Sequence, residues 1–139
     1  TKVLFLSAFL RSNTQRTHII RNMTQQPSAS QKYLRFLNLT EAVRGLTDFP
    51  RLDALEEHLL HKLAAIWHVG HRLTVLEAME VSDELSSTTI HRRLKSLRKK
   101  GVIQLINDDV DTRVKYVSPA PITLRYFEKL GECLDKASS

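Results

Sequence analysis

The chain has 139 residues, of which 42% are hydrophobic and only four each are Gly and Pro. This composition favours one mainly helical domain with a substantial core. The net charge of +6 is concentrated, because six Lys or Arg and no acid lie between Ser87 and Gly101, and such a stretch indicates a polyanionic partner. The single cysteine, Cys133, excludes an intramolecular disulfide and a multi-cysteine metal site within one chain, and it fits a reducing cytoplasm.

The first stretch, residues 1–29, is interpreted as an arm that precedes a folded domain at residues 30–139. Its apolar run between Lys2 and Arg11 is too short to span a bilayer and lacks a small-residue cleavage site, so neither a membrane span nor a secretory signal is expected. Met23 opens a polar segment, and one hypothesis is that Met23 is the initiator and that upstream-encoded or added residues precede it. The competing interpretation is an arm that packs on a partner subunit.

Two helices are predicted next from apolar residues that recur at helical spacing. The first runs from Ser30 to about Gly45. The second, about Leu52 to Val69, is the most regular and should be the core helix, with Gly70 as its stop. Four of its residues line one face: Leu55, Leu59, Leu63 and Ile66.

A shorter helix is expected from Leu73 to about Val81, burying Leu76 and Met79. The segment Val81-Ser-Asp-Glu-Leu-Ser86 then turns the chain into a basic amphipathic helix at about residues 86–100. Hydroxyl side chains at its start can accept hydrogen bonds from the first-turn N–H groups.

The basic helix is strongly two-sided. Ile90, Leu94 and Leu97 form an apolar stripe, and the opposite side carries Thr88, Arg92, Lys95 and Lys99. After the stop at Gly101, two stretches rich in β-branched and aromatic residues flank an acidic tip, which predicts a β-hairpin at about residues 102–118. Pro119 and Pro121 end the hairpin, and a last helix is expected from Ile122 to about Lys136. The fold class is therefore mainly α with a small β-hairpin.

A helix-turn-helix followed by such a wing indicates sequence-specific binding of double-stranded DNA. The candidate DNA-binding residues are Ser87, Thr88, Thr89, His91, Arg92, Lys95, Lys99, Arg113 and Lys115. The alternative is a winged-helix interaction module whose basic helix binds an acidic protein. Steep salt dependence on duplex DNA would distinguish the two.

From about Leu52 to Leu130 the chain resembles the MarR-like winged helix-turn-helix transcriptional regulators. The resemblance rests on four features: Leu73-Thr74 opening a short helix, the basic helix with its terminal Leu-x-x-x-Gly, Asp111-Thr112-Arg113 in the wing, and a helix immediately after the wing. It implies a homodimeric regulator whose terminal helices interlock, whose recognition helix enters the major groove and whose wing arginine, Arg113, reaches the minor groove. A small-molecule effector is compatible with it but unidentified.

Departures from the family pattern are concentrated in the wing, where Asp108 and Asp109 place negative charge at the tip. A second hypothesis for Arg113 is that Asp111 holds it through a charge-assisted hydrogen bond.

A further alternative is a metal-responsive regulator, because Glu57, His61 and His68 share one side of the core helix. The two histidines are about two turns apart, near 10 Å along the axis, and cannot share one ion unaided. No metal or cofactor is expected. Enzymatic activity is not expected either, since no phosphate loop, nucleophile elbow or HExxH motif occurs.

Overall fold

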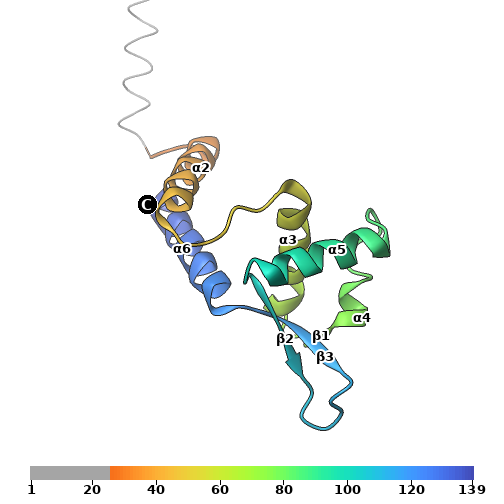
Figure 1. Ribbon diagram of the computed structural model, residues 1–139. Helices are drawn as coiled ribbons and strands as arrows, with labels where there is room; N and C mark the ends of the chain where they lie inside the picture. The colour runs from red at the N-terminus through yellow and green to blue at the C-terminus, as the bar shows by residue number, and fades with distance from the viewer. Residues whose placement is uncertain (1–25) are drawn as a thin grey trace, which may run out of the picture. The chain divides into compact units, whose positions relative to one another are not determined.

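The computed structural model describes residues 26–139, so the predictions for Met23 and the apolar run before it lie outside the described residues. The chain there is mainly helical with one small antiparallel sheet, as the sequence predicts (Figure 1). In chain order the elements are α2 (Ala29–Leu46), α3 (Ala54–His68), β1 (Leu73–Thr74), α4 (Val75–Ala78), α5 (Ser87–Lys99), β2 (Ile103–Asn107), β3 (Lys115–Pro119) and α6 (Pro121–Ser138). None of the helices from α2 onward is long and apolar enough to cross a membrane.

The chain divides into two compact units. Residues 43–131 form one, and the described part of the other comprises residues 26–42 and 132–139. The larger unit holds the core helix, the basic helix and the sheet, in the order of a winged helix-turn-helix.

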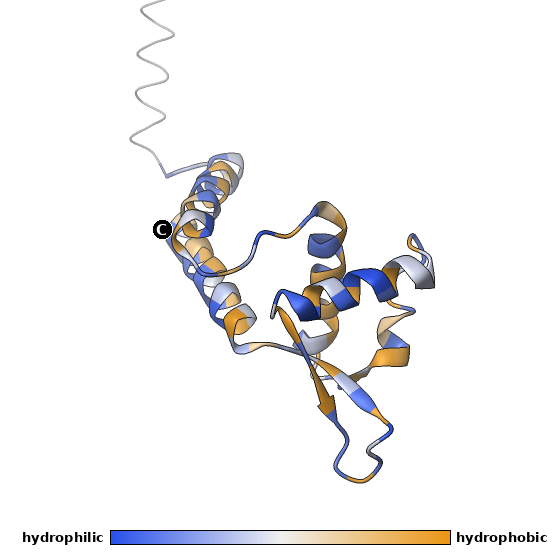
Figure 2. Cartoon of the chain, in the orientation of Figure 1, coloured by the Kyte–Doolittle hydropathy of each residue, from blue (hydrophilic) through white to orange (hydrophobic). Residues whose placement is uncertain are grey.

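The core of the larger unit lies where α3 meets α5 and the sheet. Leu59 and Leu63 of α3 are fully buried, and Ile66 packs against the same core, which confirms three of the four residues of the predicted apolar face. The indole N–H of Trp67 donates to the carbonyl of Val117 in β3 at 3.0 Å, so the end of α3 is fixed to the sheet. The basic helix contributes the predicted stripe, because Ile90, Leu94 and Leu97 are all buried. The same helix shows predominantly hydrophilic residues elsewhere (Figure 2).

The sheet has three strands in the order β1-β3-β2, all antiparallel. The predicted hairpin is correct, with Leu105 opposite Val117, but it is incomplete because Leu73 also pairs with Val117 from the other side. The short helix predicted from Leu73 to about Val81 is therefore wrong at its start, and it is also shorter than predicted because α4 ends at Ala78. Thr74 is its N-cap, in a capping box with Glu77.

The predicted burial of Leu76 is also wrong, since this side chain is 81% exposed. The helix begins at Val75, and residues at spacings of three and four share a face. Val75, Ala78 and Met79 therefore face the core, which turns Leu76 outward. The half-buried Met79 agrees with the prediction in direction.

The smaller unit contains most of α2 and the end of α6. The Arg35 guanidinium donates to the backbone carbonyl of Ser139 at 3.1 Å. Cys133 and Ala137 are buried, but α2 buries none of its side chains. The exposed apolar residues of this unit are Tyr33, Leu34, Leu37 and Leu134.

Candidate nucleic-acid interface

The basic helix starts at a well-formed cap. Ser86 is the N-cap, and its Oγ accepts from the Thr89 N–H at 3.2 Å. The hydroxyls of Ser86 and Thr89 are also hydrogen-bonded to each other at 2.9 Å. Thr89 is half-buried and engaged in the cap, whereas the predicted contacts Ser87 and Thr88 are exposed. The first turn therefore presents Ser87 and Thr88 to solvent, with Thr89 holding the turn.

The outer side of α5 is a row of cations. Arg92, Lys95 and Lys99 are exposed, as is His91. Arg98, which is not among the predicted contacts, is exposed on the shoulder of the same face. Within residues 26–139, these four Lys and Arg side chains have no ion-pair partner. A row of unpaired cations on one helical face is suited to a polyphosphate backbone.

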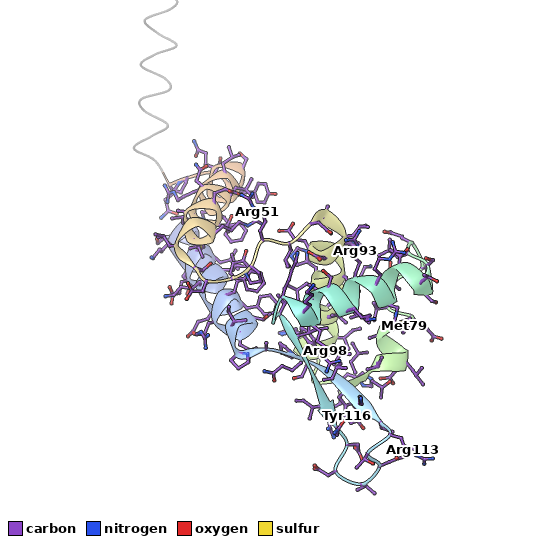
Figure 3. The ribbon with its side chains drawn as sticks, in the orientation of Figure 1. Arg51, Met79, Arg93, Arg98, Arg113 and Tyr116 are labelled. Carbon is purple, nitrogen blue, oxygen red and sulfur yellow. The ribbon has the colours of Figure 1, made fainter. Side chains whose placement is uncertain are left out.

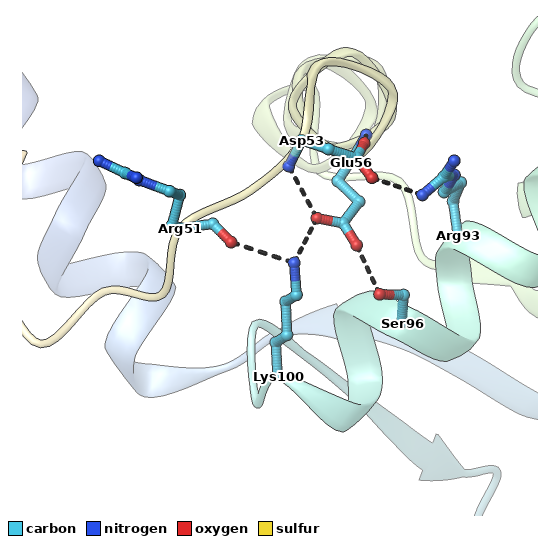
Figure 4. Close-up of polar contacts among 6 residues, drawn as sticks. All are labelled: Arg51, Asp53, Glu56, Arg93, Ser96 and Lys100. Atoms are coloured by element: carbon cyan, nitrogen blue, oxygen red, sulfur yellow. Dashed lines mark hydrogen bonds and ion pairs between the residues drawn. The ribbon is translucent and has the colours of Figure 1, made fainter.

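Two further cations of the helix are oriented toward the protein. Arg93 forms an ion pair with Asp53, the N-cap of α3. Lys100 Nζ donates to Glu56 at 2.6 Å and to the backbone carbonyl of Arg51 at 3.0 Å (Figure 4). This cluster is not among the sequence predictions, although Asp53-x-x-Glu56 before an apolar run is a recognisable capping-box signal.

Glu56 is the buried member of the cluster, with 1% of its surface exposed. Its carboxylate accepts from Lys100, from the Ser96 hydroxyl at 2.5 Å and from the backbone N–H of Asp53 at 2.9 Å. Burial alone would raise the pKa of Glu56, but the hydrogen bonds from Lys100, Ser96 and the backbone outweigh it. The pKa is lowered from 4.5 to about 2, so Glu56 is ionised at neutral pH.

The wing ends in a loop that carries Arg113 (Figure 3). The Asp111 carboxylate accepts two hydrogen bonds from the Arg113 guanidinium, at 3.0 and 3.1 Å. This pair lowers the pKa of Asp111 and raises that of Arg113. The structure confirms the hypothesis that Asp111 holds Arg113, and it leaves the Arg113 side chain 89% exposed. Lys115, at the start of β3, is also exposed.

The predicted acidic tip has an internal role. Asp108 accepts from the backbone N–H groups of Val110 and Asp111, both at 3.0 Å, and from the Tyr116 hydroxyl at 3.2 Å. The two backbone donors are the main cause of its lowered pKa. The Arg72 guanidinium lies 3.9 Å from the centroid of the Tyr116 ring, a cation–π contact. Asp108 therefore organises the loop.

The three candidate metal ligands on α3 do not converge on one site. His61 and His68 are exposed on α3, and the Glu57 carboxylate pairs with Arg44 at 2.9 Å. His71 lies 3.4 Å from Glu77. In the part of the chain that the structure describes, no three His, Cys, Asp or Glu side chains form a group that could hold a metal ion.

No protein-family model matches the chain, and no curated protein matches it. Several solved structures do. The heme sensor protein PefR from Streptococcus agalactiae, in complex with heme, is 20% identical over 88% of this chain and 74% of its own, with a TM-score of 0.47. A structure of reduced AbfR bound to DNA is 17% identical, covering 95% and 84% of the two chains at a TM-score of 0.44.

The adhesin competence repressor AdcR from Streptococcus pyogenes is similar over 78% of each chain, with 23% identity and a TM-score of 0.39. Similarities this distant carry no argument about what the chain binds, which is inferred from its own residues.

Proposed function

We propose that the chain is a sequence-specific, double-stranded DNA-binding transcriptional regulator of the MarR-like type, acting as a homodimer. The observation that carries the proposal is the two-sidedness of α5. Its buried stripe of Ile90, Leu94 and Leu97 fixes the helix to the core, while the opposite face carries only exposed polar and cationic side chains. A helix of about 13 residues is roughly 20 Å long, which suits a major groove.

Arg92 is proposed to read bases. It lies in the second turn of α5, on the exposed face, and a guanidinium can donate two hydrogen bonds to a guanine edge. Ser87, Thr88 and His91 are proposed to fix the register of the helix through phosphates or adjacent base edges. Lys95 and Lys99 lie further along and are proposed to contact the backbone.

The wing is proposed to add a second contact. Two hydrogen bonds from its guanidinium to Asp111 orient Arg113 before DNA arrives, and because the pair is exposed, Asp111 can release the arginine to a phosphate on binding. A pre-oriented arginine is suited to a narrow minor groove, where the negative potential is strongest. Lys115 is proposed to contact a neighbouring phosphate.

Dimerisation is proposed through α2 and α6. The smaller unit leaves Tyr33 60%, Leu34 58% and Leu134 53% exposed, and several large exposed apolar side chains on one small unit favour a protein interface. A second copy of the chain is the proposed partner, because a symmetric dimer would place two recognition helices on two half-sites. Sedimentation should give a dimer at micromolar concentration, and a strict monomer would overturn this part.

The experiment that tests the proposal is selection of binding sequences from random duplexes, followed by affinity measurements as salt is varied. Arg92→Ala should weaken binding and relax the sequence preference, by about 1–3 kcal/mol of discrimination at one base pair. Lys99→Ala should weaken binding to every duplex alike and reduce the salt slope by about one unit. Circular dichroism should first show that both variants are folded.

Two outcomes would count against the proposal. Equal losses on selected and random DNA in both variants would mean that the helix is only an electrostatic clamp. If the unmodified chain showed no salt-dependent affinity for duplex DNA, the helix would instead be a surface for an acidic protein.

A further inference from the structure

We infer that Glu56 and Lys100 are positioning residues for the recognition helix, and that adjacent cations of α5 therefore have opposite roles. Lys99 and Arg92 face outward, whereas Lys100 and Arg93 hold the helix on α3. The inference rests on the proposed function, since it concerns how the DNA-contacting face is oriented.

The contacts of Glu56 join three segments of the chain. One carboxylate oxygen accepts from the Asp53 backbone N–H at 2.9 Å and from Lys100 at 2.6 Å, and the other accepts from Ser96. Lys100 also donates to the carbonyl of Arg51. One buried anion thus connects the start of α3, the loop segment before it and the C-terminal half of α5 (Figure 4).

Asp53 provides a second attachment beside the first. Its side chain accepts from the Glu56 N–H at 2.9 Å within the capping box and also from Arg93. Both carboxylates of the box therefore serve two purposes: they cap α3, and they bind α5. The contacted residues of α5, at positions 93, 96 and 100, lie on one flank of the apolar stripe.

These contacts restrict the rotation of α5 about its own axis, which the apolar stripe alone does not restrict. Hydrophobic contacts are non-directional, so Ile90, Leu94 and Leu97 hold α5 against the core without setting its rotation closely. Charge-assisted hydrogen bonds have narrow distance and angle preferences. The Glu56 contacts on one flank therefore determine which side chains the helix presents outward.

The consequence for binding is that only some of the cations of this segment are available to a partner. Glu56 has 2% and Lys100 34% of the side chain exposed, so Lys100 is neutralised within the protein. Lys99, one residue earlier, is exposed and has no ion-pair partner among residues 26–139. Removing Lys99 should remove a phosphate contact, whereas removing Lys100 should disturb the helix without removing one.

The test compares Lys99→Met with Lys100→Met in affinity for a random-sequence duplex over a range of salt concentrations. Lys99→Met should reduce the slope of log affinity against log salt by about 0.9 and leave the denaturation midpoint unchanged. Lys100→Met should lower the denaturation midpoint and displace the affinity line downward at an unchanged slope. Lys100→Arg, which can still pair with Glu56, should restore both properties.

Each result has a distinct meaning. Equal slope losses in Lys99→Met and Lys100→Met, with equal midpoints, would overturn the division of roles while the proposed function stands. Failure of Lys100→Arg to restore either property would show that the Glu56 pair does not position the helix. If the unmodified chain binds no duplex, the proposed function fails and the positioning role falls with it, although the midpoint difference between the two methionine variants would persist.

Discussion

The lowered pKa of Glu56 predicts how the stability of the protein depends on pH. Its pKa falls from 4.5 to about 2 on folding, and each pKa unit corresponds to about 1.4 kcal/mol. The folded state therefore binds this proton more weakly than the unfolded state does. The ionised carboxylate should contribute about 3 kcal/mol to the free energy of unfolding above about pH 5, and this contribution should be lost as pH falls toward about 2.

The assay is chemical denaturation of the unmodified chain and of Glu56→Gln from about pH 6 down to about pH 2. Other carboxylates, such as those of Asp108 and Asp111, also have lowered pKa values, so neither curve alone isolates Glu56. The difference between the two curves does. It should favour the unmodified chain near neutrality, because Glu56→Gln leaves Lys100 without its anion, and it should shrink by about 3 kcal/mol on acidification. Curves that stay parallel would refute the assignment of Glu56 as an ionised, buried anion.

Three other variants test the fold and the wing. Leu97→Ala should lower the free energy of unfolding by about 2–5 kcal/mol, because Leu97 is fully buried; a smaller loss in denaturation would mean that the stripe is loosely packed. Gly101→Ala should cost about 1–2 kcal/mol through its φ of +76° alone, since a Cβ there has open space, whereas Gly131→Ala in α6 should not destabilise. Arg113→Ala should reduce the salt slope on duplex DNA by about 0.9, and an unchanged slope would exclude a phosphate contact by this arginine.

The long elements could be predicted from the sequence because their patterns are long. α3, α5 and α6 each repeat their apolar residues over several turns, and Gly70 and Gly101 end helices with the positive φ that glycine favours. The wing was predictable from two stretches of β-branched residues around a polar tip. β1 was not, because two residues are too few to show alternation, and its pairing with β3 depends on a partner more than 40 residues away.

The charged residues show a different limit. Arg92 and Arg93 are neighbours of the same type, as are Lys99 and Lys100, and helical spacing places each pair on adjacent parts of one wheel. Which member of each pair faces the protein depends on Asp53 and Glu56. These two acids precede the cations that they bind by 40 and 44 residues along the chain. The sequence showed a capping-box pattern there but not its second use. Counting cations on the helix therefore overstates the positive charge that the helix presents to a partner.

Burial decides what an acid–base pair does at this interface. The wing pair Asp111–Arg113 and the helix pair Glu56–Lys100 are both charge-assisted, but they differ in burial: 89% of the Arg113 side chain is exposed, against 34% for Lys100 and 2% for Glu56. An exposed pair is weakened by water and salt, so Arg113 can exchange its carboxylate for a phosphate at little cost.

Removing the cation from a buried carboxylate costs several kcal/mol of stability, so Lys100 cannot exchange Glu56 for a phosphate. The cations available to DNA on α5 and the wing are then Arg92, Lys95, Arg98, Lys99, Arg113 and Lys115. Arg92 is assigned to a base edge, so one phosphate for each of the other five would give a salt slope of about −4.5 per protomer, whereas adding Arg93 and Lys100 would give about −6.3. A measured slope near the larger value would mean that the cluster around Glu56 opens when DNA binds.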